Sequence, residues 1–155
     1  MREDIKARWT ARLRSGQDAQ GTGYLKQEVA SGRYDYCCLG VLCEIAVEDG
    51  IVRPSELRGM SGSIHTFTAV DDLTDNSDTI LPLAVARWAD ISADGYQQPH
   101  DPEAVCPDRN GEEICVNELC GICRTLALTE LNDGDNGSMP ALPFPEIADV
   151  IEKWF

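Results

Sequence analysis

The chain has 155 residues, with 13 Lys and Arg against 27 Asp and Glu, seven Cys and a formal net charge of −14. This length predicts one domain, and a hydrophobic content of 43% is enough for a core, which argues against wholesale disorder. The negative charge argues against direct nucleic-acid binding, and no apolar run is long enough for a membrane helix. Because the start also lacks a signal-peptide pattern, we expect a cytoplasmic protein without membrane contact.

The charge is distributed unevenly along the chain. The first 33 residues contain seven basic and four acidic residues, so the rest of the chain carries a net charge of −17. The simpler interpretation is a pair of complementary faces within one fold. The alternative is an acidic surface that imitates nucleic acid and occupies a basic protein.

The first elements are a helix and a hairpin. Ile5, Trp9 and Leu13 recur every four residues, which predicts a helix with Trp9 as a core anchor and Ser15-Gly16 as its end. Two short strands, at 23–29 and 33–37, flank a turn and predict a β-hairpin.

An apolar block follows, and it predicts a buried helix from about Cys38 to Glu48. Gly40 inside that helix costs about 1 kcal/mol relative to Ala, so we expect close packing there. Cys37 and Cys38 would lie at the helix N-terminus, where the helix dipole lowers the pKa of a thiol.

Cys37 and Cys38 are therefore the candidate nucleophiles if the protein is an enzyme. The competing interpretation is that they are small core hydrophobes, as most free cysteines are. A Cys nucleophile also needs a base, and the chain offers only His65 and His100, both in polar, loop-like sequence. For His65 a hydrogen-bonded structural role is the simpler interpretation.

Residues 52–79 read as an irregular, variable insertion, in which 64–70 alternates like a strand. A helix is predicted from Leu81 to Asp90, with Pro82 in its first turn. The remaining expected elements are a hairpin at 103–116, a helix from Glu118 to about Leu131, and a last helix that Pro145 opens.

The second half holds four cysteines with the spacing C-x8-C-x4-C-x2-C: Cys106, Cys115, Cys120 and Cys123. Structural zinc sites are often assembled from a C-x2-C pair and a second, distant pair, so these four are candidate zinc ligands, with His100 in reserve. The competing interpretation is that Cys123 is a core residue on the apolar face of a helix. A disulfide between these cysteines is disfavoured if the protein stays in a reducing cytosol.

Several ordered motifs together resemble a family of small uncharacterised proteins of tailed bacteriophages and prophages. They are Trp9 to Gly16, Gln20 to Leu25, the Cys-Cys-Leu-Gly-Val-Leu-Cys block at 37–43, Leu81-Pro82 with Trp88, the Leu-Asn-Asp block at 131–133, and Pro145 to Glu152. The resemblance covers most of the chain except about 52–79, and it implies a phage source without an established activity. The second hairpin of that family lacks cysteines, so a zinc site here would be a local addition.

Asn132 and Asp133 have two interpretations. They can end a helix, because Asn and Asp bond locally to the backbone. Alternatively, they form a polar pair near Cys37 and Cys38, and Cys38, Asn132 and Asp133 then hold a small polar ligand.

We therefore predict a single α+β domain over residues 1–155, with two β-hairpins packed against four or five helices. The predicted function is that of a phage-encoded accessory protein, which acts in the host cytoplasm by non-catalytic binding of a host protein, such as a defence component, or of a small polar ligand. The alternatives are a small Cys-dependent enzyme and an acidic nucleic-acid mimic.

Overall fold

A computed structural model describes residues 1–59, 62–91, 105–107, 113–115, 128–134 and 140–155, with the backbone alone at 56–59, 62, 105–107, 113–115 and 154. The described part contains five helices, a six-stranded sheet and a separate two-stranded one, which confirms the α+β class. In this part no helix has the length and apolar character needed to cross a bilayer.

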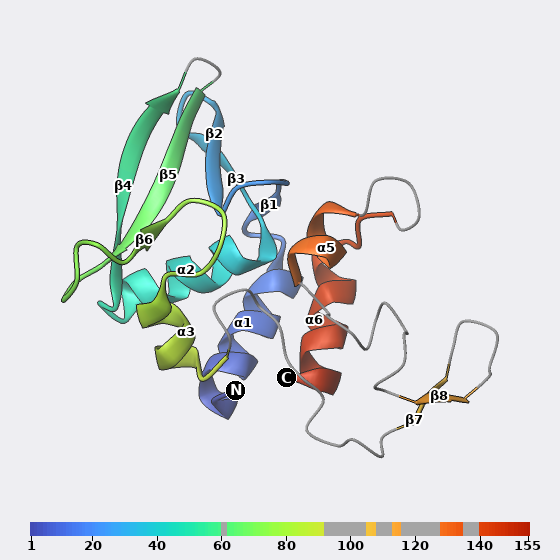
Figure 1. Cartoon of the computed structure of the whole chain (residues 1–155). Helices are drawn as coiled ribbons and strands as arrows, with labels where there is room; N and C mark the ends of the chain where they lie inside the picture. The colour runs from blue at the N-terminus through green and yellow to red at the C-terminus, as the bar shows by residue number, and fades with distance from the viewer. Residues whose placement is uncertain (60–61, 92–104, 108–112, 116–127, 135–139) are drawn as a thin grey trace.

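Three helices form one layer of the molecule (Figure 1). Helix α1 (Glu3–Ser15) contacts both α2 (Cys38–Glu48) and α6 (Phe144–Trp154). The predicted stripe of α1 is confirmed, since Ile5, Trp9 and Leu13 are all buried, and Gly16 ends the helix in the left-handed conformation.

The six-stranded sheet stands beside these helices (Figure 1). Its order is β1-β3-β2-β5-β4, with β6 paired to β5; the strands are β1 (Ala19–Gln20), β2 (Lys26–Ala30), β3 (Arg33–Tyr36), β4 (Val52–Gly59), β5 (Gly62–Ala69) and β6 (Asn76–Ser77). The antiparallel pairing of β2 with β3 confirms the first predicted hairpin.

Within residues 52–79 the strand-like alternation at 64–70 is confirmed by β5, but the expectation of irregular chain before it is wrong, because β4 is a regular strand. Strands β4 and β5 form a long antiparallel hairpin with Val52 opposite Ala69. Pro54 makes this segment difficult to predict as a strand, because proline interrupts most strands. Here it lies in β4, at the end of the strand order, where a missing backbone donor is tolerated.

The remaining elements follow the predicted order. They are α3 (Leu83–Ala89), β7 (Val105–Pro107), β8 (Glu113–Cys115) and α5 (Leu128–Asp133), before α6. β7 and β8 are antiparallel, which confirms the second predicted hairpin. Most of the helix expected from Glu118 lies outside the described residues.

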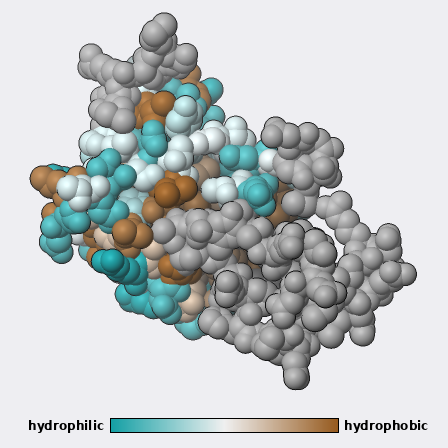
Figure 2. Space-filling model, viewed as in Figure 1, coloured by the Kyte–Doolittle hydropathy of each residue, from teal (hydrophilic) through white to brown (hydrophobic). Residues whose placement is uncertain are grey.

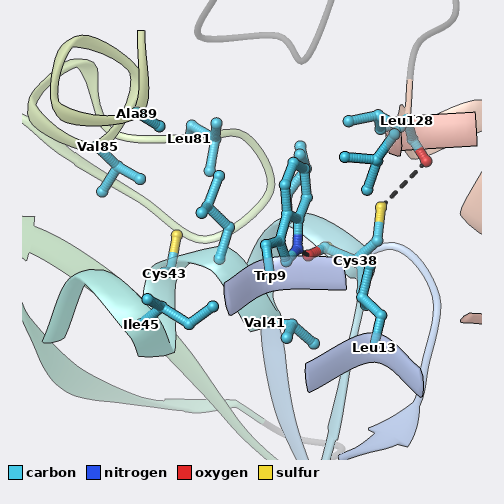
Figure 3. Packing of buried hydrophobic residues seen from close by; sticks show 14 of the residues in the cluster. Trp9, Leu13, Cys38, Val41, Cys43, Ile45, Leu81, Val85, Ala89 and Leu128 are labelled. Carbon is cyan, nitrogen blue, oxygen red and sulfur yellow. Dashed lines mark hydrogen bonds between the residues drawn. The ribbon is translucent and has the colours of Figure 1, made fainter. Parts of the chain in front are cut away.

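The core gathers around α2, and Figure 3 shows its packing against Trp9 and Leu81. The expected close approach at Gly40 is confirmed, because a Cβ there would lie only 1.6 Å from the carbonyl oxygen of Leu25. Glycine therefore lets α2 press directly against the chain that leads into β2.

The basic N-terminal segment is neutralised within the fold. Six of its seven basic residues pair with carboxylates: Arg2 with Asp4, Lys6 with Glu3, Arg8 with Glu48 and Asp49, Arg12 with Asp18 and Glu48, Arg14 with Asp149 and Glu152, and Lys26 with Glu44. Four of these residues, Arg8, Arg12, Arg14 and Lys26, reach carboxylates outside the first 33 residues, which agrees with complementary faces, whereas Arg2 and Lys6 pair within the segment. Each exposed ion pair adds little stability. Because these basic residues are already paired, they do not neutralise the remaining acidic residues of the chain.

Candidate functional site

Asn132 lies at a polar junction where the start of α2 meets the end of α5. Its Oδ1 accepts a hydrogen bond from the backbone N–H of Cys38 at 3.1 Å, and its Nδ2 donates to the carbonyl oxygen of Gly21 at 2.8 Å. The side chain is completely buried. It therefore caps α2 from a position 94 residues away in the sequence.

Gln20 and Asp133 extend this junction. Gln20 donates to the carbonyl oxygen of Leu142 at 2.8 Å and accepts from the N–H of Phe144 at 3.0 Å. Asp133 accepts from the side-chain amide of Asn132 at 2.7 Å and from the N–H of Gly23 at 3.0 Å. The loop after α1 is thereby joined to the segment between α5 and α6.

Both predictions for Asn132 and Asp133 contain a correct part. Helix α5 ends at Asp133, and Gly134 follows in the left-handed conformation. The pair is also brought to the start of α2, next to Cys37 and Cys38, as the alternative predicted. However, Cys38 and Asn132 are fully buried and hydrogen-bonded internally, so they present no surface to a ligand.

The cysteines of the 37–43 block behave as core residues. Cys37 accepts a hydrogen bond from the N–H of Gly40, and the Cys38 thiol donates to the carbonyl oxygen of Leu128 at 3.3 Å (Figure 3). The indole N–H of Trp9 donates to the carbonyl oxygen of Cys38, also seen in Figure 3.

The expected lowering of the thiol pKa at the start of α2 is wrong in direction. Burial raises the pKa of Cys37 from 9.0 to about 11, against the opposing effect of the N–H of Gly40. Burial likewise raises the pKa of Cys38 and Cys43 well above the usual value. The dipole argument failed because desolvation of a thiolate outweighs what one helix end contributes.

The zinc prediction lies largely outside the described residues, which exclude Cys120, Cys123 and His100. In the β7–β8 hairpin, Cys106 is opposite Ile114 and Cys115 is opposite Val105. Among the residues that the structure does describe, no three His, Cys, Asp or Glu gather as a metal site would require. The four-cysteine zinc site stays a prediction.

A groove of about 370 Å³ between α3 and the ends of β4 and β5 was not predicted. Its polar lining comes from Asp71, Asp72, Asp75 and Arg87, and its apolar lining includes Ile51 and the side chains of α3. The hydrophobic periodicity of the sequence indicated no site for these aspartates, because they lie in a segment without a helical or strand-like pattern. A signal was present, because Leu73 stands between them as a large hydrophobic residue in an acidic segment.

The comparisons place the whole chain in one family. A family model described as a domain of unknown function (DUF8296) matches residues 1–155, so the chain belongs to that family. No curated protein and no solved structure matches it.

Proposed function

We propose that this member of the DUF8296 family is a phage-encoded accessory protein that acts in the host cytoplasm by non-catalytic binding of a host protein. The observation that carries the proposal is the contrast between the sealed junction at Asn132 and the open groove beside α3. The resemblance of the sequence motifs to phage and prophage proteins supports the source.

The state of the thiols argues against the Cys-dependent enzyme. A nucleophilic cysteine needs a thiolate that a substrate can reach. Cys37 and Cys38 are buried and their pKa values are raised. The thiol of Cys38 also donates a hydrogen bond to the backbone carbonyl of Leu128. These features are typical of structural cysteines.

The burial of Cys38 and Asn132 also argues against a small polar ligand held by Cys38, Asn132 and the exposed Asp133. Four groups already surround the side-chain amide of Asn132, namely the N–H of Cys38, the side-chain N–H of Gln20, the carbonyl of Gly21 and the carboxylate of Asp133. A polar ligand would have to displace these hydrogen bonds. A protein partner on the exposed surface requires no such rearrangement.

Alkylation of the native protein tests the non-catalytic part. Iodoacetamide at neutral pH, followed by peptide mass mapping, should leave Cys37, Cys38 and Cys43 unmodified, while unfolded protein reacts at all three. Rapid modification of Cys37 or Cys38 in the folded protein would instead support the enzyme alternative.

Affinity capture tests the binding part. The tagged chain, expressed in a bacterial host that supports such phages, should retain one host protein in near-stoichiometric amount through a wash at moderate salt. The matched control is the chain with Gly40→Ala and Asn132→Ala combined, which we expect to lose its native fold and therefore the partner, because the two changes together remove more stability than either alone. Recovery of no host protein, or of equal amounts with both chains, would contradict the proposal.

A further inference from the structure

The groove beside α3 combines apolar walls with carboxylates. Ile51, Ala84 and Trp88 contribute apolar surface, and Asp71 and Asp72 lie at its other side. Its volume of about 370 Å³ is within the range in which proteins hold side chains or small ligands.

The carboxylates are held in place by the surrounding backbone. Asp75 accepts hydrogen bonds from the N–H groups of Leu83 and Ala84 at 2.8 and 2.7 Å, which fixes α3 against the β5–β6 loop. Asp72 accepts from both the N–H and the hydroxyl of Thr74, and this hydrogen bonding lowers its pKa. Within the described part of the chain, Asp71 accepts no hydrogen bond. With Arg87 as the only cation of the lining, the groove is net negative at neutral pH.

Exposed hydrophobic side chains concentrate in the chain segment that also supplies the carboxylates of the groove lining. Among the described residues, five large hydrophobics are exposed, and four of them lie in 70–83: Val70, Leu73, Ile80 and Leu83, with exposures from 48% to 61%. Figure 2 shows hydrophobic and hydrophilic residues side by side on this part of the surface. An apolar group next to unneutralised carboxylates suggests a surface that a partner covers.

Building on the proposed function, we propose that this groove is the docking site, and that its occupant is a segment of the partner protein with an apolar side chain flanked by Lys or Arg. The apolar side chain enters the groove against Ile51 and Leu83, the flanking cations face Asp71 and Asp72, and the exposed Leu73, next to Asp72 in the chain, is covered by the same segment.

Charge complementarity selects this occupant over two others. A second copy of the chain carries the same net charge of −14 and would be repelled. Residues 92–127 of the same chain contain seven acidic and two basic residues, so they too are electrostatically mismatched. A basic partner is attracted at long range and then held by desolvation of the apolar contact.

Titration with synthetic peptides tests this inference by NMR on the 15N-labelled protein. The probe is a peptide of leucines and lysines, and its partner control replaces every lysine by glutamate. Only the basic probe should shift the backbone signals of residues 70–75 and 83–88. Leu73→Ser and Asp71→Lys should each weaken its binding by about tenfold, corresponding to about 1.4 kcal/mol.

Two matched variants control for general electrostatics. Val29→Ser removes the fifth exposed hydrophobic, and Glu146→Lys makes the same charge change as Asp71→Lys at an exposed position of α6. Both should bind the basic probe within about twofold of the unmodified chain. Equal losses in all four variants, or shifts spread over the whole surface, would overturn the inference.

A captured host protein separates this inference from the proposed function. If Leu73→Ser and Asp71→Lys both fold and still retain that protein fully, the docking site is wrong while the proposed binding function stands. If the unmodified chain captures nothing, the proposed function itself fails.

Discussion

The junction at Asn132 gathers two side-chain amides and one carboxylate, and the groove beside α3 gathers three carboxylates, but the two regions differ in where these groups point. At the junction every named polar side chain is satisfied by the chain itself, and Cys38 and Asn132 are fully buried. At the groove the carboxylates border open space and half-exposed hydrophobic side chains. The buried Cys38 and Asn132 thus serve the fold, whereas the acidic loop that contains Leu73 belongs to the surface that we propose for binding.

The largest expected effect is that of Gly40→Ala, which tests how tightly the sealed region is packed. The added methyl group would lie 1.6 Å from the carbonyl oxygen of Leu25, so the helix or the chain leading into β2 must move. We expect a loss of more than about 3 kcal/mol in the free energy of unfolding, measured in urea. The control is Gly32→Ala, which introduces backbone strain in open space and should cost about 1 kcal/mol. Equal losses would contradict the close contact.

Asn132→Ala comes next and tests the junction directly. It leaves the N–H of Cys38 and the carbonyl of Gly21 buried without their partner, so unfolding should become easier by about 3 kcal/mol. Glu130→Ala, at an exposed neighbouring position of α5, should change stability by less than about 0.5 kcal/mol. If both variants unfold alike, the cap on α2 is unimportant.

The pH dependence of stability tests the buried thiol. Below pH 9 both folded and unfolded protein keep the Cys37 proton, but between pH 9 and about 11 only the unfolded chain loses it. The stability that the buried thiol contributes is therefore lost as pH rises through this window, by about 3 kcal/mol. Cys37→Ser keeps an acceptor for the N–H of Gly40 and should show a shallower decline in urea unfolding across the window. Parallel curves for the two proteins would place the thiol in contact with solvent.

The smallest expected effect belongs to the groove. Leu73→Ser removes a side chain that is 61% exposed, so the free energy of unfolding should change by less than about 0.5 kcal/mol. A thermal melt in parallel with the unmodified chain is sufficient. A loss above about 1 kcal/mol would mean that Leu73 belongs to the core, and the contrast between the two regions would then disappear.

Local patterns predicted the elements well where one face is buried. The four-residue spacing of Ile5, Trp9 and Leu13 identified α1, and Gly40 indicated a close contact before its neighbour was known. Strand β4 was missed because Arg53, Pro54 and Ser55 are all exposed, which removes the alternation that reveals a half-buried strand. Its position is set by pairing with β5.

The candidate sites were harder to predict, because their properties depend on distant contacts. The proximity of Asn132 to Cys38 was one of two predicted alternatives. Because both residues are fully buried, this proximity is a structural contact and not a ligand site. The pKa of Cys37 rises because α2 lies in the core, which helix position alone does not indicate. The groove depends on Asp75, which fixes α3 beside a loop eight and nine residues earlier in the chain.

The hydrogen bond between Asn132 and the start of α2 spans 94 residues, and this separation affects the order in which the chain folds during synthesis. The ribosome synthesises the apolar helix α2 well before α5 and α6. However, the side-chain amide that caps the start of α2 comes from α5. The carboxylates that pair with Arg14 come from α6. Contacts across 94 and more residues form late, because a long loop must close first. The nascent chain therefore carries an incompletely packed apolar helix until α5 and α6 have been synthesised, and the contacts that complete its packing form late in folding.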